Sequence, residues 1–86
     1  MRKHFIFEGK VQNVGFRPRA QYAANGIGVS GWVKNQWDGT VEMEAQGTSE
    51  QIDMLLRKIN SGEYIRIDRI TTTEIPEEEG KGFHIR

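Results

Sequence analysis

The amino-acid sequence predicts an α+β domain in which two helices lie on one face of an antiparallel sheet. Strands are indicated near both ends of the chain, where apolar and polar residues alternate. Helices are indicated near residues 18–27 and 48–59, where apolar residues recur at intervals of three and four. Asp38-Gly39 lies between two further alternating segments, which is typical of a β-hairpin. The predicted order is therefore strand, helix, hairpin, helix and strand, with a short additional strand at the C-terminus.

The first strand is predicted at residues 3–12, where Phe5 and Phe7 fall on one face and charged residues on the other. The first helix is predicted at about residues 18–25, since proline is favourable at the first helical position. Gly26 is expected to end this helix in a left-handed conformation. The expected buried stripe of the helix is Ala20, Ala23, Ala24 and Ile27.

Residues 26–31 spell G-x-G-x-x-G, the pattern of dinucleotide-binding loops. In those loops a strand precedes the glycines and a helix follows them, so that the pyrophosphate lies at the helix N-terminus. Here a predicted helix precedes the glycines and a predicted strand follows. We therefore interpret these glycines as the end of a helix and the beginning of a strand.

Two strands are predicted at residues 29–35 and 40–46, joined by a turn at residues 36–39. The second helix is predicted to begin after Thr48, with Gln51 completing a capping box. The apolar residues expected in the core are Val41, Met43 and Ala45 from the hairpin and Ile52, Leu55, Leu56 and Ile59 from the helix.

The second helix is expected to end at Gly62. A further strand is predicted at residues 68–75, with Ile70 as its apolar anchor, and a last strand at residues 82–86. Together these elements predict a ferredoxin-like βαββαβ sandwich with a short C-terminal edge strand. We expect residues 1–86 to form a single domain.

The composition excludes several kinds of site. The chain has no cysteine, which excludes disulfides, thiolate nucleophiles and cysteine zinc sites. Lys+Arg and Asp+Glu are both 12, and this balance argues against nucleic acid or an anionic membrane as partner. Neither a membrane span nor a signal peptide is recognisable, so we expect a soluble monomer in the cytoplasm. Its histidine and carboxylate residues are not spaced as metal ligands, and we expect no metal and no cofactor.

Residues 9–18 form a glycine-bearing loop between the first strand and the first helix, with Arg17 near the helix start. Unpaired backbone N–H groups and the helix dipole make such a helix start an anion site, and arginine adds a full positive charge. The loop is not a P-loop, because Gly9 and Gly15 are one residue too far apart and no lysine and hydroxyl residue follow. Two interpretations remain from the spacing alone, namely a phosphate-binding loop and a plain turn.

The sequence offers little support for a nucleophile activated by histidine. His4 and His84 lie in the first and last predicted strands, away from the loop, and we interpret them as surface or edge-strand residues. Phosphoryl transfer from a reactive donor can proceed by positioning and electrostatic stabilisation alone. An acyl phosphate is such a donor, because its leaving group is a stable carboxylate.

Two segments of the chain resemble the motifs of the acylphosphatases. The usual family patterns are V-Q-G-V-G-F-R followed by G-W-V-x-N-x-x-D-G-x-V. The resemblance covers nearly the whole chain and includes the Gly-Phe-x-Ile of residues 82–85. The matching residues are Val11, Gln12, Val14, Gly15, Phe16 and Arg17 in the first motif, and Gly31, Trp32, Val33, Asn35, Asp38, Gly39 and Val41 in the second.

The resemblance implies hydrolysis of the carboxyl–phosphate bond of small acyl phosphates to carboxylate and inorganic phosphate, without metal or cofactor. It implies that the catalytic Arg17 binds the phosphoryl group and that the catalytic Asn35 orients the attacking water. It also implies that backbone amides of the loop bind the phosphate. The loop residues are Gln12, Asn13, Val14, Gly15, Phe16 and Arg17.

Two residues of the loop region depart from the family pattern. Asn13 stands where the family usually has glycine, and because asparagine tolerates positive φ we expect the loop to close. Pro18 directly follows the arginine, and in this the chain resembles the N-terminal acylphosphatase-like domain of the hydrogenase maturation carbamoyltransferase. That domain handles carbamoyl phosphate within a much longer chain. Since this chain ends directly after its last predicted strand, we expect a stand-alone enzyme.

Two other functions are alternatives. One is a non-catalytic module of the same fold that binds phosphate or an acyl phosphate. The other is an RNA-binding domain, which needs exposed aromatic residues on the central strands, whereas Phe5 and Phe7 are expected in the core. Trp37 is either a contact for the acyl group or an exposed turn residue.

Overall fold

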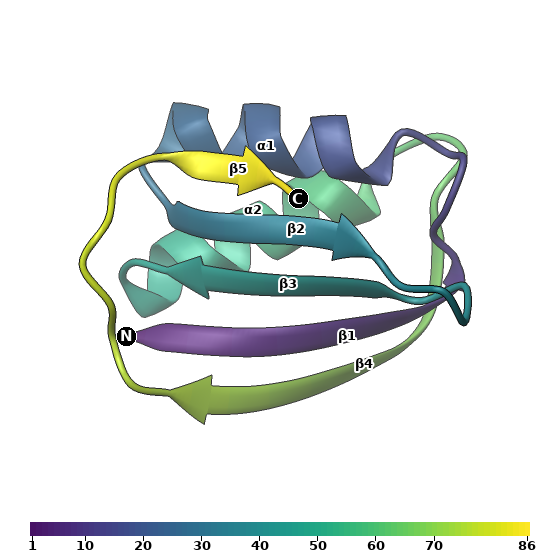
Figure 1. Ribbon diagram of the computed structural model, residues 1–86. Coiled ribbons are helices and arrows are strands. Elements are labelled where there is room, and N and C mark those ends of the chain that lie inside the picture. The colour runs from purple at the N-terminus through teal and green to yellow at the C-terminus, as the bar shows by residue number, and fades with distance from the viewer.

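The computed structural model describes residues 1–86 and contains two helices on one face of a five-stranded sheet (Figure 1). The strand order is β4-β1-β3-β2-β5. Neighbouring strands are antiparallel except for β5, which lies parallel to β2 at the edge. The predicted fold class is confirmed. The elements are β1 (Arg2–Lys10), α1 (Phe16–Ile27), β2 (Ser30–Asn35), β3 (Val41–Gln46), α2 (Ser49–Asn60), β4 (Arg66–Ile75) and β5 (Phe83–Ile85).

The core lies between the helices and the inner face of the sheet. Phe5 and Phe7 are buried as predicted, with ring centroids 5.7 Å apart. Phe16, the first residue of α1, packs on Phe7 with centroids 4.9 Å apart. This contact places the beginning of α1 over the second half of β1. The small buried residues of α1 that face the sheet are Ala20, Ala23 and Ala24, as predicted.

The first helix begins earlier and ends later than predicted. It begins at Phe16, so Pro18 occupies its third position rather than its first. The prediction that Gly26 ends the helix is wrong, because the left-handed residue is Gly28, with φ 97°. Gly28 N donates to Ala24 O at 2.8 Å, which is the bond of the αL motif, and Val29 N donates to the same oxygen at 2.9 Å, which is the longer of the two bonds of the Schellman motif. Ile27, the last residue of α1, packs against the core.

The second helix has the predicted capping box. Gln51 N donates to Thr48 Oγ1 at 3.1 Å, and Thr48 N donates to Gln51 Oε1 at 2.8 Å. The last residue of the helix is Asn60, and its C-cap is Ser61 rather than Gly62. The prediction that Ile70 anchors β4 in the core is wrong, since this residue is 42% exposed. The physical reason is that β4 is an edge strand, paired only with β1 and exposed along most of its length.

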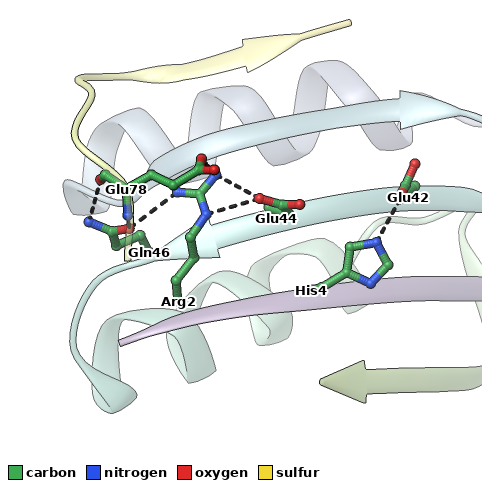
Figure 2. Close-up of polar contacts among 6 residues, drawn as sticks. All are labelled: Arg2, His4, Glu42, Glu44, Gln46 and Glu78. Atoms are coloured by element: carbon green, nitrogen blue, oxygen red, sulfur yellow. Dashed lines mark hydrogen bonds and ion pairs between the residues drawn. The ribbon is translucent and has the colours of Figure 1, made fainter. Parts of the chain in front are cut away.

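The face of the sheet opposite the helices carries a network of charged and polar side chains (Figure 2). Arg2 is 4% exposed and lies at its centre. Its guanidinium contacts Glu44 at 2.9 Å, Gln46 at 3.2 Å and Glu78 at 3.2 Å. Gln46 also exchanges two hydrogen bonds with the backbone of Glu78. The network therefore holds the loop between β4 and β5 against the sheet.

None of the helices has the length and apolar character that crossing a bilayer requires.

Candidate active site

The loop between β1 and α1 lies at the same end of the sheet as the turn between β2 and β3 (Figure 1). Asn13 has φ 61° and is the one residue other than glycine with a positive φ. Gly15, the N-cap of α1, has φ 77°. Asparagine is among the few residues that adopt this left-handed conformation readily, and the prediction that Asn13 allows the loop to close is therefore consistent with the backbone.

The backbone N–H groups of residues 12–17 donate to no acceptor in the protein. The first hydrogen bond of the helix runs from Arg19 N to Gly15 O at 3.1 Å. Gly15 supplies no side chain to cap the helix, and the first turn contains no acidic residue. A helix N-terminus with free N–H groups and no carboxylate nearby is an anion-binding arrangement.

Two arginines occur in the first turn of α1, and they have different surroundings. Arg19 donates from Nε to Lys58 O at 2.6 Å and from Nη2 to Ser61 Oγ at 2.7 Å, which joins it to the end of α2. Arg17 is half-buried and is not paired with any carboxylate. Of the two guanidinium groups, the Arg17 group is therefore the one available to an anion at the helix start.

Asn35 is the last residue of β2 and lies in the same row of the sheet as Phe7. Val41 is opposite Asn35 on one side and opposite Phe7 on the other. Since paired residues are about 5 Å apart, the Cα atoms of Phe7 and Asn35 are about 10 Å apart. Val33 is fully buried beneath the helices, and because strand side chains alternate, Asn35 projects to the helix side as well. Asn35 and the start of α1 therefore lie on the same face, at the same end of the sheet.

The turn that follows Asn35 is stabilised by its own side chains. Asp38 Oδ1 accepts hydrogen bonds from Thr40 Oγ1 at 2.7 Å and Thr40 N at 3.0 Å. These bonds, the one from the Thr40 side chain foremost, lower the pKa of Asp38. Gln36 donates to Glu42, on the outer face of the sheet. Trp37 is 97% exposed, which agrees with its interpretation as an exposed turn residue.

One feature of the site has no signal in the sequence. The Gln12 side chain leaves the loop and donates to Gln36 O at 2.7 Å and to Thr40 O at 2.9 Å. From the sequence, only the backbone of Gln12 is expected in the site. A side-chain bond to backbone carbonyls more than twenty residues away depends on tertiary structure, and no local pattern of residues predicts it.

The histidines lie away from the loop, as expected. His4 Nε2 is 2.6 Å from Glu42 Oε2 on the open face of the sheet (Figure 2). His84 is exposed in β5 and contacts Lys81 O at 2.9 Å.

Comparison with known proteins agrees with these observations. The family model described as acylphosphatase matches residues 3–85. An acylphosphatase of Leuconostoc mesenteroides is 46% identical over 80 residues, covering 91% of this chain and 89% of that protein. The crystal structure of acylphosphatase from Bacillus subtilis has a TM-score of 0.88 at 33% identity, covering 99% of this chain and 97% of that one. Full-length HypF, crystallised with phosphate and nucleotide, has a TM-score of 0.85 at 27% identity, over 99% of this chain but 11% of that one. The chain belongs to the acylphosphatase family.

Proposed function

We propose that the protein hydrolyses small acyl phosphates where the loop of residues 12–17 meets the turn between β2 and β3. Family membership gives the reaction class, and the single observation that carries the location is the set of unpaired N–H groups in that loop. The phosphoryl group of the substrate would accept hydrogen bonds from these groups. Arg17 would add a planar pair of donors and a full charge, which neutralises charge on the phosphoryl oxygens in the transition state.

Asn35 is proposed to orient the attacking water. Its side-chain amide projects from the end of β2 toward the helix side, where it can hold a water in line with the phosphorus. The water oxygen forms a bond to phosphorus while the bond from phosphorus to the acyl oxygen breaks. One water proton passes to a phosphate oxygen of the substrate, and the acyl group leaves as a carboxylate. No acid is needed for this leaving group, and the step as written uses no metal.

The experiment is phosphate release from benzoyl phosphate, measured in the presence of a chelator. Arg17→Ala should lower kcat/KM by at least ~10³, the lower range for arginine in phosphoryl transfer. Arg19→Ala is the matched control, since its side chain is occupied by Lys58 and Ser61. This control should lose stability and retain turnover. Turnover by Arg17→Ala within tenfold of the wild-type value would contradict the assignment.

Asn35→Ala separates water orientation from phosphate binding. We expect kcat to fall by ~10², the scale of a misplaced reacting group, while inhibition by inorganic phosphate changes little. If Asn35→Ala instead weakens phosphate inhibition as strongly as Arg17→Ala does, Asn35 binds the phosphoryl group and does not orient water.

Pro18, whose position after Arg17 resembles the carbamoyltransferase domain, favours a second candidate, a module of the same fold that handles carbamoyl phosphate. It is less well supported, because identity to the full-length HypF is 27% whereas the acylphosphatase of Leuconostoc mesenteroides is 46% identical over 80 residues. Comparing turnover of benzoyl, acetyl and carbamoyl phosphate distinguishes the two. A non-catalytic module would bind inorganic phosphate and release none from any of the three.

A further inference from the structure

Gln12 connects the two halves of the site. Both hydrogens of its Nε2 are used, one toward Gln36 O at 2.7 Å and one toward Thr40 O at 2.9 Å. Both partners are carbonyl oxygens, which accept and do not donate. The NH₂ end of the side chain must therefore face them, and the orientation of the amide is fixed by chemistry.

These two carbonyls are the ones that close the turn after Asn35. Gln36 N donates to Thr40 O at 2.9 Å, and Gly39 N donates to Gln36 O at 3.2 Å. Each carbonyl has two lone pairs, so one accepts the bond within the turn and the other accepts from Gln12. Gln12 thus holds the backbone of the turn one residue beyond Asn35.

No other hydrogen bond joins the loop of residues 12–17 to the segment of residues 35–40. The pairing of β1 with β3 ends at Phe7 and Val41, and beyond that row β1 pairs only with β4. The sheet itself therefore does not fix the distance between the loop and the turn.

We propose that Gln12 is a positioning residue that fixes Asn35 relative to the phosphate-binding loop. The proposal rests on the proposed function, because it assigns Gln12 an effect exerted through Asn35. With both of its donors used, the Gln12 side-chain amide holds the turn and leaves phosphate binding to the backbone N–H groups and Arg17. A displacement of about 1 Å in a reacting group costs ~10² in rate. Gln12→Ala should therefore lower kcat by ~10- to 100-fold and change inhibition by inorganic phosphate by less than about threefold.

A double-mutant cycle tests whether Gln12 acts through Asn35. Gln12→Ala is introduced into the wild-type protein and into Asn35→Ala, and kcat for benzoyl phosphate is measured in all four proteins. In the Asn35→Ala background we expect a further loss of less than about threefold, because the group that Gln12 positions is already absent. Equal losses in both backgrounds would overturn the proposal.

Gln51→Ala is the control for a general loss of structure. Gln51 is also partly buried, and its side chain also bonds to backbone, accepting from Thr48 N at 2.8 Å and donating to Ile27 O at 3.3 Å. It lies at the start of α2, away from the loop. Gln51→Ala should lower the urea midpoint and leave kcat unchanged. If Gln51→Ala lowers kcat as Gln12→Ala does, the effect is one of stability alone.

Gln12→Glu gives a readout that a merely structural role would not produce. The variant is isosteric, but its carboxylate faces two carbonyl oxygens, which favours the neutral acid and raises its pKa. The neutral acid has one O–H donor and can restore one of the two bonds. Relative to wild type, kcat of Gln12→Glu should rise as the pH falls, while Gln12→Ala keeps a constant ratio.

The two proposals fail in different ways. A wild-type protein that releases no phosphate from any acyl phosphate refutes the proposed function. A wild-type protein with normal turnover, in which Gln12→Glu follows Gln12→Ala at every pH, overturns only the role of Gln12.

Discussion

Replacing Arg2 by methionine measures how strongly the charged network on the open face stabilises the fold (Figure 2). The Arg2 side chain is 5% exposed and that of Glu44 is 19% exposed. Arg2 Nε and Nη2 each lie 2.9 Å from Glu44 Oε1. Methionine keeps most of the apolar stem of arginine and removes every donor. The variant therefore leaves Glu44 without its cation, and it also removes the contacts of Arg2 with Gln46 and with the exposed Glu78.

The expected loss follows from the exposure of the partners. Removing one member of a fully buried ion pair costs about 3–5 kcal/mol. In the variant, water can still reach part of the Glu44 carboxylate and solvate it. We therefore expect Arg2→Met to lower the free energy of unfolding by about 2–3 kcal/mol. The Glu78 side chain is 64% exposed and lies 3.2 Å from Arg2 Nη2. Glu78→Gln should therefore cost less than about 1 kcal/mol.

Equilibrium unfolding in urea at neutral pH gives both values. The double variant Arg2→Met/Glu44→Gln should be more stable than the sum of the single losses predicts, by about 1–2 kcal/mol, because no largely buried charge is left unpaired. A loss below about 1 kcal/mol for Arg2→Met would refute the reasoning. So would an equal loss in Glu78→Gln, since the exposed partner would then matter as much as the buried one.

Two further predictions concern the site. Asn13→Ala should lower the free energy of unfolding by about 1–2 kcal/mol because alanine is strained at the positive φ of this position, whereas Asn13→Gly should change it by less than about 0.5 kcal/mol. Urea midpoints measure both changes, and an Asn13→Ala protein as stable as wild type would contradict the strain argument. Hydrogen bonds from Thr40 lower the pKa of Asp38 in the folded protein below its ordinary value of 3.8, so ionised Asp38 stabilises the folded state. This stabilisation is fully present above pH 3.8 and is lost as the pH falls through the lower pKa of the folded protein. Asp38→Asn should remove that part of the acid dependence, and unfolding measured between pH 5 and 2 would show no difference from wild type if the turn bonds contribute nothing.

Features decided by neighbours in sequence were predicted well. The capping box of Thr48 and Gln51 needs only residues three apart, and it is present. The Asp-Gly turn and the alternation around Phe5 and Phe7 are equally local, and both were confirmed. Combining such elements gave the fold, because two helices and alternating strands in this order have few ways to bury their apolar faces.

Features decided by tertiary surroundings were predicted poorly. Ile70 has the residue type of a core position, but it lies on an edge strand and is 42% exposed. Gly26 and Gly28 are both suitable helix ends, and the later one is used, which brings Ile27 into contact with the core. The bonds from Gln12 to the turn likewise arise only when the chain is folded. At the site, then, the sequence indicates the helix start that we propose binds the anion, but it gives no sign of the bonds that join the loop to the turn after Asn35.

The two arginines of α1 explain why the helix start favours an anion. Residues two apart on a helix project about 200° apart, so Arg17 and Arg19 cannot share a partner. Arg19 reaches the C-terminal end of α2, where carbonyl groups carry partial negative charge, and it is stabilised there. Arg17 remains at the positive end of the α1 dipole, where a cation costs about 0.3–1 kcal/mol and no acidic residue of the first turn offsets it. A phosphoryl group at this position would be attracted both by the helix dipole and by Arg17, so the arrangement that is unfavourable in the free protein is the one that we propose for substrate binding.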